Sequence, residues 1–137
     1  MDNRAKKLLN WLKGKRVGVF CDDPNLYYAY KKYKWRIDFA KFKNLLVRYC
    51  DLEFINYYVA IPDRFDADFK RVESFLKHIS SSVVVKKKPL KYIPVKNWFV
   101  RKGDVDIEIT LDVVRTIDDL DVVMIMSGDS DYYALKD

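Results

Sequence analysis

Two apolar runs of this chain each end in acidic residues. Val122–Met126 is followed directly by Ser-Gly-Asp-Ser-Asp at 127–131, and residues 17–21 are followed by Asp22 and Asp23. Short, continuous apolar runs are typical of parallel strands that are buried on both faces. In an open α/β sheet, ligands bind just outside the carboxyl ends of the strands. If the two strands are neighbours, at least three carboxylates meet at one edge of the sheet.

Carboxylates gathered in this way repel one another. Two of them about 5 Å apart repel by roughly 3 kcal/mol at an effective dielectric constant of about 20. The cluster therefore needs a proton or a cation. Carboxylate oxygens beside a phosphate are typical of Mg²⁺ or Mn²⁺ sites. The pattern favours metal-dependent chemistry on a phosphodiester.

Strand-like and helix-like apolar periodicities alternate along the chain. We expect helices over residues 4–13, 25–33, 38–50, 66–79 and 104–117, and strands over 16–21, 54–61, 82–85 and 121–126. Residues 86–101 contain Pro89 and Pro94, and we expect an irregular or hairpin-like excursion there. Strands that alternate with helices predict an α/β fold, with a mostly parallel sheet covered on both faces.

The charge is divided unevenly between the two ends of the chain. Residues 104–137 hold ten acidic and two basic side chains, whereas residues 1–103 hold ten acidic and 24 basic ones. A basic body beside an acidic portion is expected of a polyanion-binding surface next to a metal site. Lysine-rich faces also serve solubility, so the charge alone leaves the partner open.

Several classes of protein are disfavoured by the composition. No stretch of about 18 apolar residues exists, so we expect no membrane span. Residues 1–14 are interpreted as an amphipathic helix and not as a signal peptide. We expect Cys21 and Cys50 to be reduced thiols in a cytoplasmic protein, the alternative being a disulfide or a metal-binding pair. His78 is the only histidine, which argues against Ser-His or Cys-His catalysis.

Each candidate site residue also has a purely structural interpretation. Asp22 is either a cation ligand or part of an N-capping turn, and Asn25 is placed to hold Asp22 or a substrate phosphate. Asp106 is either a ligand or an ordinary acidic residue in a first helical turn. Asp112 lies on an apolar helix face and either anchors a hydrogen-bond network behind the site or reaches solvent.

A basic and aromatic segment precedes this helix. It contains Lys86, Lys87, Lys88, Lys91, Tyr92, Lys96, Trp98, Arg101 and Lys102. Cations that follow phosphates and aromatic rings that stack on bases are the two components of a single-strand binding surface. The alternative is a solvated loop whose aromatic side chains pack on the body of the protein.

Three motifs together resemble the NYN family, a branch of the PIN-like ribonuclease domains. They are residues 17–28, residues 102–106 with Asp112, and residues 127–132, in the order and spacing of that family. The resemblance spans nearly the whole chain after Lys15. It implies a PIN-like Rossmannoid three-layer sandwich with a mostly parallel central sheet, and RNA as substrate. It further implies that Mg²⁺ or Mn²⁺ is bound by four acidic residues, Asp22, Asp106, Asp129 and Asp131.

The chain departs from the family pattern in two places. The family usually has Gly directly after the first Asp, whereas this chain has Asp23, which would either crowd the site or add a ligand. The family domain also continues past the last motif, so we expect residues 15–137 to lack its last strand and helix. A sheet edge left open in this way is either truncated or covered by a second copy in a homodimer.

Our main hypothesis is a metal-dependent ribonuclease that acts on single-stranded RNA. The four aspartates would bind the ions and carry the catalysis, and other polar residues would hold the substrate: Asn25, Lys86, Lys87, Lys88, Lys102, Ser127 and Ser130. The alternative is an RNA-binding module of the same fold with little or no turnover. A third hypothesis, a metal-dependent phosphatase of small phosphoesters, uses the same carboxylates but leaves the long basic face unexplained.

Overall fold

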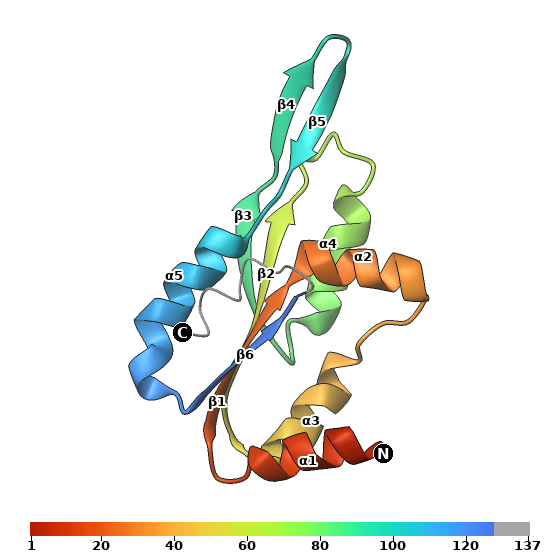
Figure 1. Ribbon diagram of the computed structural model, residues 1–137. Coiled ribbons are helices and arrows are strands. Elements are labelled where there is room, and N and C mark those ends of the chain that lie inside the picture. Colours follow the sequence, from red (N-terminus) through yellow and green to blue (C-terminus); the bar gives the residue numbers. More distant parts are fainter. Residues whose placement is uncertain (128–137) are drawn as a thin grey trace.

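The computed structural model describes residues 1–127, apart from the side chain of Tyr28 (Figure 1). The helices and strands follow one another as α1 (Asn3–Trp11), β1 (Arg16–Asp22), α2 (Asp23–Tyr33), α3 (Phe39–Tyr49), β2 (Asp51–Ile61), α4 (Phe69–Ile79), β3 (Val84–Pro89), β4 (Lys91–Val95), β5 (Trp98–Lys102), α5 (Asp106–Thr116), the 3₁₀ turn η1 (Ile117–Asp119) and β6 (Val122–Met126). Within this part of the chain, no helix is both long and apolar enough to cross a bilayer.

Four parallel strands form the central sheet in the order β3-β2-β1-β6. The two apolar runs that end in acidic residues are therefore neighbours, with Cys21 of β1 opposite Met126 of β6. The chain first builds outward through β2 and β3, and then returns to add β6 on the other side of β1. This reversal places the topological switch point between β1 and β6, where ligands bind in open α/β sheets.

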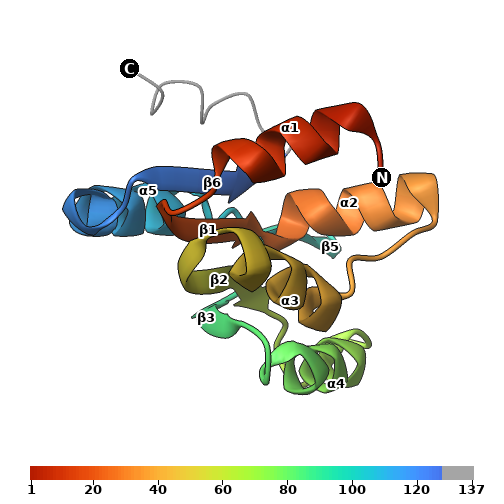
Figure 2. The same cartoon turned by 90° about the horizontal axis from the view of Figure 1, so that it is seen from below.

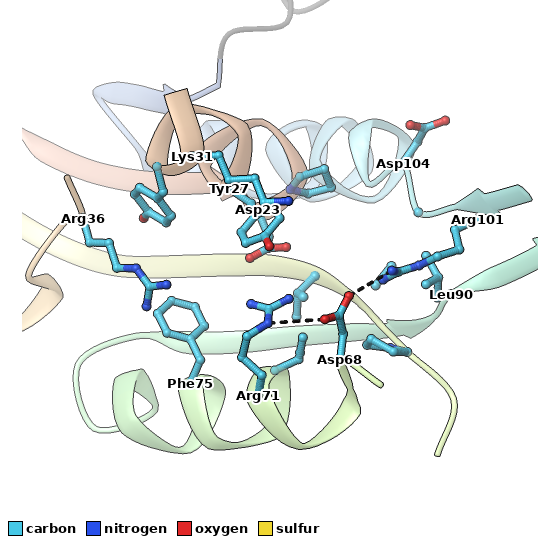
Figure 3. Close-up of a pocket in the computed structure, with 17 residues that line it drawn as sticks. Asp23, Tyr27, Lys31, Arg36, Asp68, Arg71, Phe75, Leu90, Arg101 and Asp104 are labelled. Atoms are coloured by element: carbon cyan, nitrogen blue, oxygen red, sulfur yellow. Dashed lines mark hydrogen bonds and ion pairs between the residues drawn. The ribbon is translucent and has the colours of Figure 1, made fainter. Parts of the chain in front are cut away.

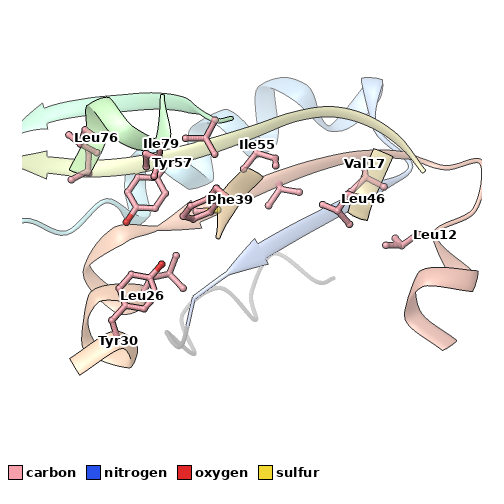
Figure 4. Close-up of a cluster of buried hydrophobic side chains, with 14 of the residues drawn as sticks. Leu12, Val17, Leu26, Tyr30, Phe39, Leu46, Ile55, Tyr57, Leu76 and Ile79 are labelled. Atoms are coloured by element: carbon pink, nitrogen blue, oxygen red, sulfur yellow. The ribbon is translucent and has the colours of Figure 1, made fainter. Parts of the chain in front are cut away.

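Helices cover both faces of the sheet, as the alternation of elements predicts (Figure 2). The first four helices pack on one face and bury a cluster that includes Leu12, Leu46, Tyr57 and Leu76 (Figure 4). Helix α5 packs on the other face, where Ile109 contacts a smaller cluster built around Phe20 and Tyr58 of the strands. Burial of each such large side chain stabilises the fold by about 1.5–3 kcal/mol. The fold is the predicted three-layer α/β sandwich.

Neighbouring side chains leave no room for a side chain at Gly18 of β1. A Cβ atom at this position would lie 2.7 Å from both Leu120 Cδ1 and Phe54 Cζ. Real Cβ atoms do not approach other atoms that closely, so only glycine fits without a shift of its neighbours. The glycine in the first apolar run is therefore required by packing on the α5 side of the sheet.

The segment after α4 contains a longer strand than the sequence pattern indicates, and its hairpin is the second of the two expected alternatives. Strand β3 continues to Pro89 instead of stopping near Val85, because Lys86–Lys88 pair in register with Tyr58–Ala60 of β2. Strands β4 and β5 then form a regular antiparallel hairpin.

Among the described strands, β3 and β6 form the two edges of the central sheet. A homodimer across the β6 edge stays a prediction.

Candidate functional site

Asp22 is the last residue of β1, and its side chain is only 3% exposed. It is also the N-cap of α2, and the backbone N–H of Asn25 donates to Asp22 Oδ1 at 3.4 Å. The side-chain amide of Asn25 donates to Asp22 Oδ2 at 2.8 Å, and the hydroxyl of Ser127 donates to the same oxygen at 3.1 Å. The structure therefore brings together three of the predicted site residues, Asp22, Asn25 and Ser127, at the switch point.

The carboxylate of Asp22 lies on the α5 side of the sheet. Successive side chains of a strand alternate between the two faces, and Phe20, two residues earlier, belongs to the cluster under α5. Helix α5 runs from the hairpin back to the start of β6, so its amino end lies toward the carboxyl edge. Asp106, the first residue of this helix, is half-buried there. Asp22 and Asp106 thus share a side and an end of the sheet.

The other two predicted ligands, Asp129 and Asp131, lie outside the described residues, as does Ser130. Within residues 1–127, no three acidic, histidine or cysteine side chains are close enough together to hold a metal ion. Two of the four predicted ligands can therefore be placed, and their role as ligands stays a prediction. Their oxygen-only chemistry is the donor set that Mg²⁺ and Mn²⁺ prefer.

Asp23 faces the opposite side of the sheet from Asp22. The hydroxyl of Tyr57 donates to Asp23 Oδ1, and Tyr57 belongs to the core beneath the first four helices. Burial raises the pKa of the Asp23 carboxyl above its ordinary value, although the hydrogen bond from Tyr57 opposes the shift. The side chain of Asp23 therefore points away from Asn25 and Ser127, the hydrogen-bond partners of Asp22.

A cleft of about 500 Å³ lies between α2 and α4, with Asp23 in its wall (Figure 3). Asp68 approaches two cations there, with Arg101 Nη1 at 3.0 Å and Arg71 Nε at 3.6 Å. The hydrogen bond from Arg101 lowers the pKa of the Asp68 carboxyl. Arg71 also lies 4.9 Å from the ring centre of Tyr27. The sequence singles out Arg101 only as part of the basic and aromatic segment, because its pairing with Asp68 is brought about by tertiary structure.

Asp112 forms a network behind the sheet, which was the first of its two predicted interpretations. The hydroxyl of Tyr58 donates to Asp112 Oδ2 at 2.7 Å, and the side chain of Asn56 donates to the same hydroxyl at 3.2 Å. Arg115 of the same helix lies 3.6 Å from the other carboxylate oxygen. The network ties α5 to the central strand β2.

The predicted substrate-binding lysines lie on the edge strand β3 and at the end of β5. Lys86 and Lys87 are exposed, whereas Lys88 forms an ion pair of 3.0 Å with Glu108 of α5. The three β3 lysines line a hollow of about 250 Å³ against α5. Lys102 is exposed at the last position of β5. The pairing of Lys88 leaves Lys86, Lys87 and Lys102 as the better candidates for contact with a polyanion.

Comparisons with known proteins agree with this architecture. A family model described as the NYN domain matches residues 16–136. The chain is 27% identical over 120 residues to the low amplitude and bright protein LabA of Synechococcus elongatus. The matched region covers 85% of this chain and 63% of LabA. It therefore spans less than two thirds of that relative's length.

A solved structure has the same fold. The crystal structure of a protein of unknown function from Vibrio parahaemolyticus is similar with a TM-score of 0.66 and 27% identity. The similarity covers 89% of this chain and 72% of the other.

Proposed function

Because the chain belongs to the NYN family of PIN-like domains, we propose that it is a divalent-metal-dependent ribonuclease that acts on single-stranded RNA. The observation that carries this proposal is the position of Asp22. A buried carboxylate is uncommon unless it is paired or binds a metal, and this one ends the central strand at the switch point of the sheet.

In this proposal, Asp22 and Asp106 bind Mg²⁺ or Mn²⁺ together with Asp129 and Asp131, which lie beyond the described residues. A bound ion would activate a water molecule and balance negative charge on the leaving oxygen. The chain itself supplies orientation, because Asn25 and Ser127 both donate to Asp22 Oδ2. Hydrogen bonds of this kind hold a ligating carboxylate in one orientation.

The basic surface would hold the RNA. Lys86, Lys87 and Lys102 are exposed at or beside the edge where β1 and β6 end. Lysines that contact phosphates release counterions and attract a nucleic acid without regard to its sequence.

We also propose a cytoplasmic location, since Cys21 and Cys50 are both free thiols and a reducing compartment keeps thiols free.

The RNA-binding module without turnover remains the second candidate, and one observation favours it. Both oxygens of Asp22 accept hydrogen bonds from the chain itself. A site that is satisfied internally can be structural. This candidate predicts RNA binding that is independent of metal and falls steeply with salt.

Cleavage of an end-labelled single-stranded RNA tests the proposal. The assay compares Mn²⁺, Mg²⁺ and EDTA for the wild-type chain, for Asp22→Asn and for Asp121→Asn as a matched control. Asp121 directly precedes the first residue of β6, at the end of the strand away from Asp22. Its exposed carboxylate forms an ion pair with Arg16 at 3.1 Å. An exposed pair of this kind contributes about 0–1 kcal/mol, so the control should fold.

We expect metal-dependent cleavage by the wild type and by Asp121→Asn, and a loss of at least about 100-fold in Asp22→Asn, as for other removed catalytic contacts. Asp129→Asn tests a second predicted ligand in the same assay. Cleavage that persists in Asp22→Asn would show that Asp22 is not part of the mechanism. Cleavage that persists in EDTA would show that no metal is needed. Tight RNA binding by a folded protein that never cleaves would support the binding module instead.

A further inference from the structure

The β4–β5 hairpin projects beyond the central sheet (Figure 1), and its register gives it two faces with different side chains. Residues directly opposite each other in an antiparallel pair point to the same face, and the faces alternate along each strand. The register therefore gives one face of four residues: Tyr92, Pro94, Phe99 and Arg101. The opposite face carries six residues: Lys91, Ile93, Val95, Trp98, Val100 and Lys102.

The first face anchors the hairpin to the loop between β2 and α4. The rings of Tyr92 and Phe99 lie 4.9 Å and 6.4 Å from the ring of Phe65. The hydroxyl of Tyr92 donates to Asp66 Oδ2 at 2.9 Å. Arg101 approaches the same carboxylate at 3.5 Å. The direction of the hairpin is thus fixed by both polar and aromatic contacts.

The opposite face is apolar and exposed. Trp98 is 78% exposed, and Ile93, Val95 and Val100 are between 44% and 49% exposed. An exposed apolar strip of this kind marks an interaction surface more often than a single exposed side chain does. We call these four residues the outer strip. The exposed indole of Trp98 offers a flat surface on which a flat, apolar group of a partner can stack.

The charge around the outer strip identifies the kind of partner. Lys91 and Lys102 flank the strip at its base, and Lys96 lies in the turn beside Trp98. Residues 84–102 contain seven Lys or Arg residues and no Asp or Glu, and of these seven Lys88 and Arg101 pair with acidic residues of other segments. A second copy of the chain that docked through the same strip would bring these like charges together, which is unfavourable. A polyanion with flat apolar groups matches both the strip and its charge, and single-stranded RNA is such a molecule.

Building on the proposed ribonuclease function, we propose that the outer strip is an RNA-binding arm, on which Trp98 stacks on a base while the flanking lysines contact phosphates. The hairpin leaves the sheet after β3, at the same carboxyl edge where β1 ends in Asp22. Each of its five-residue strands extends roughly 16 Å, at about 3.3 Å per residue. The arm lengthens the RNA-binding surface away from the carboxylates.

Binding of a fluorescent oligouridylate, measured by anisotropy in EDTA, tests the arm separately from catalysis. Trp98→Ala should weaken binding by roughly 5- to 150-fold, the loss expected for one stacked base. Trp98→Phe keeps an aromatic ring and should recover most of the affinity. Trp11→Ala is the matched control, because Trp11 is also exposed (55%) but lies on α1, at the far end of the molecule (Figure 1).

The flanking lysines have their own measurable signature. Lys91→Gln and Lys96→Gln should each reduce the slope of log affinity against log salt by about 0.7, the value for one phosphate contact on a single strand. Lys70→Gln on α4 is the corresponding control and should leave the slope unchanged.

The results separate the arm from the nuclease. Equal RNA affinities of Trp98→Ala and Trp11→Ala, or no RNA binding by the wild type, would show that the outer strip does not bind RNA. Either result would hold even if the protein cleaves RNA. Weaker binding by Trp98→Ala in a protein that never cleaves would support the arm and reject the nuclease. If Trp98→Ala keeps its RNA affinity but converts a dimer into a monomer in sedimentation, the strip binds a second copy and the proposal is wrong.

Discussion

Asp22 has a structural role and a proposed catalytic role, and two substitutions should separate them. Asp22→Ala removes the N-cap of α2, which costs about 1 kcal/mol. It also removes the acceptor of the Asn25 amide and the Ser127 hydroxyl, at about 1–1.5 kcal/mol for each bond. Relief from burying a carboxylate offsets part of this loss. We therefore expect the free energy of unfolding to fall by about 2–4 kcal/mol.

Asp22→Asn should behave differently. Asparagine caps helices as well as aspartate does, but its one carbonyl oxygen keeps either the cap or the bonds to Oδ2, so we expect a smaller loss of about 1–2 kcal/mol. Urea denaturation followed by circular dichroism, in EDTA, measures both values. The corresponding fall in Tm for the alanine variant is roughly 6–15 °C for a domain of this size. Both variants should fail to cleave RNA.

Either of two results would refute this reasoning. If Asp22→Ala unfolds within about 0.5 kcal/mol of the wild type, a difference typical of neutral surface changes, Asp22 does not hold α2 against β6. If Asp22→Asn is destabilised as much as Asp22→Ala, the negative charge holds the site together and not the oxygen acceptor.

Three further predictions concern the scaffold around the site. Gly18→Ala places a Cβ 2.7 Å from two side chains and should lower the free energy of unfolding by about 1–3 kcal/mol in urea; unchanged stability would mean that these neighbours move freely. Tyr58→Phe removes the 2.7 Å bond to Asp112 and should cost about 1–2 kcal/mol in the same measurement, whereas no loss would show that this network is not stabilising. Burial raises the pKa of the Cys21 thiol to about 12, so at pH 8 a thiol reagent should label Cys50 in the folded protein and Cys21 only after unfolding; rapid labelling of both would contradict the burial of Cys21.

The parallel sheet could be predicted because its signal is local. The runs that became β1 and β6 are continuous and apolar, and the residues that follow them favour turns and caps. The spacing of Asp22 and Asn25 is that of an N-cap and the residue three positions on, so their hydrogen bond could also be expected. Tertiary structure then adds Ser127, which follows β6 about a hundred residues later in the chain.

The length of β3 could not be predicted from the same signals, and they left the hairpin as one of two alternatives. Consecutive lysines and a proline disfavour a central strand, but β3 is an edge strand, where both are tolerated. Pro94 lies in a two-stranded sheet, where each strand has a free edge.

The orientation of Asp23 depends on a tertiary contact. The sequence shows two adjacent acids and suggests that both serve one site. The structure assigns Asp23 to the opposite face because Tyr57 of β2 lies there to donate a hydrogen bond. The pairing of Asp68 with Arg101 also joins segments 33 residues apart, and no local pattern announces it.

The most direct test of the central claim is Mn²⁺ binding in the absence of RNA, followed by electron paramagnetic resonance of the free ion. We expect the wild-type chain and Asp121→Asn to bind Mn²⁺ alike, and Asp22→Asn to bind it at least about tenfold more weakly, a difference of about 1.4 kcal/mol. Equal binding by Asp22→Asn, or no binding by the folded wild type at millimolar Mn²⁺, would contradict a metal site built on Asp22.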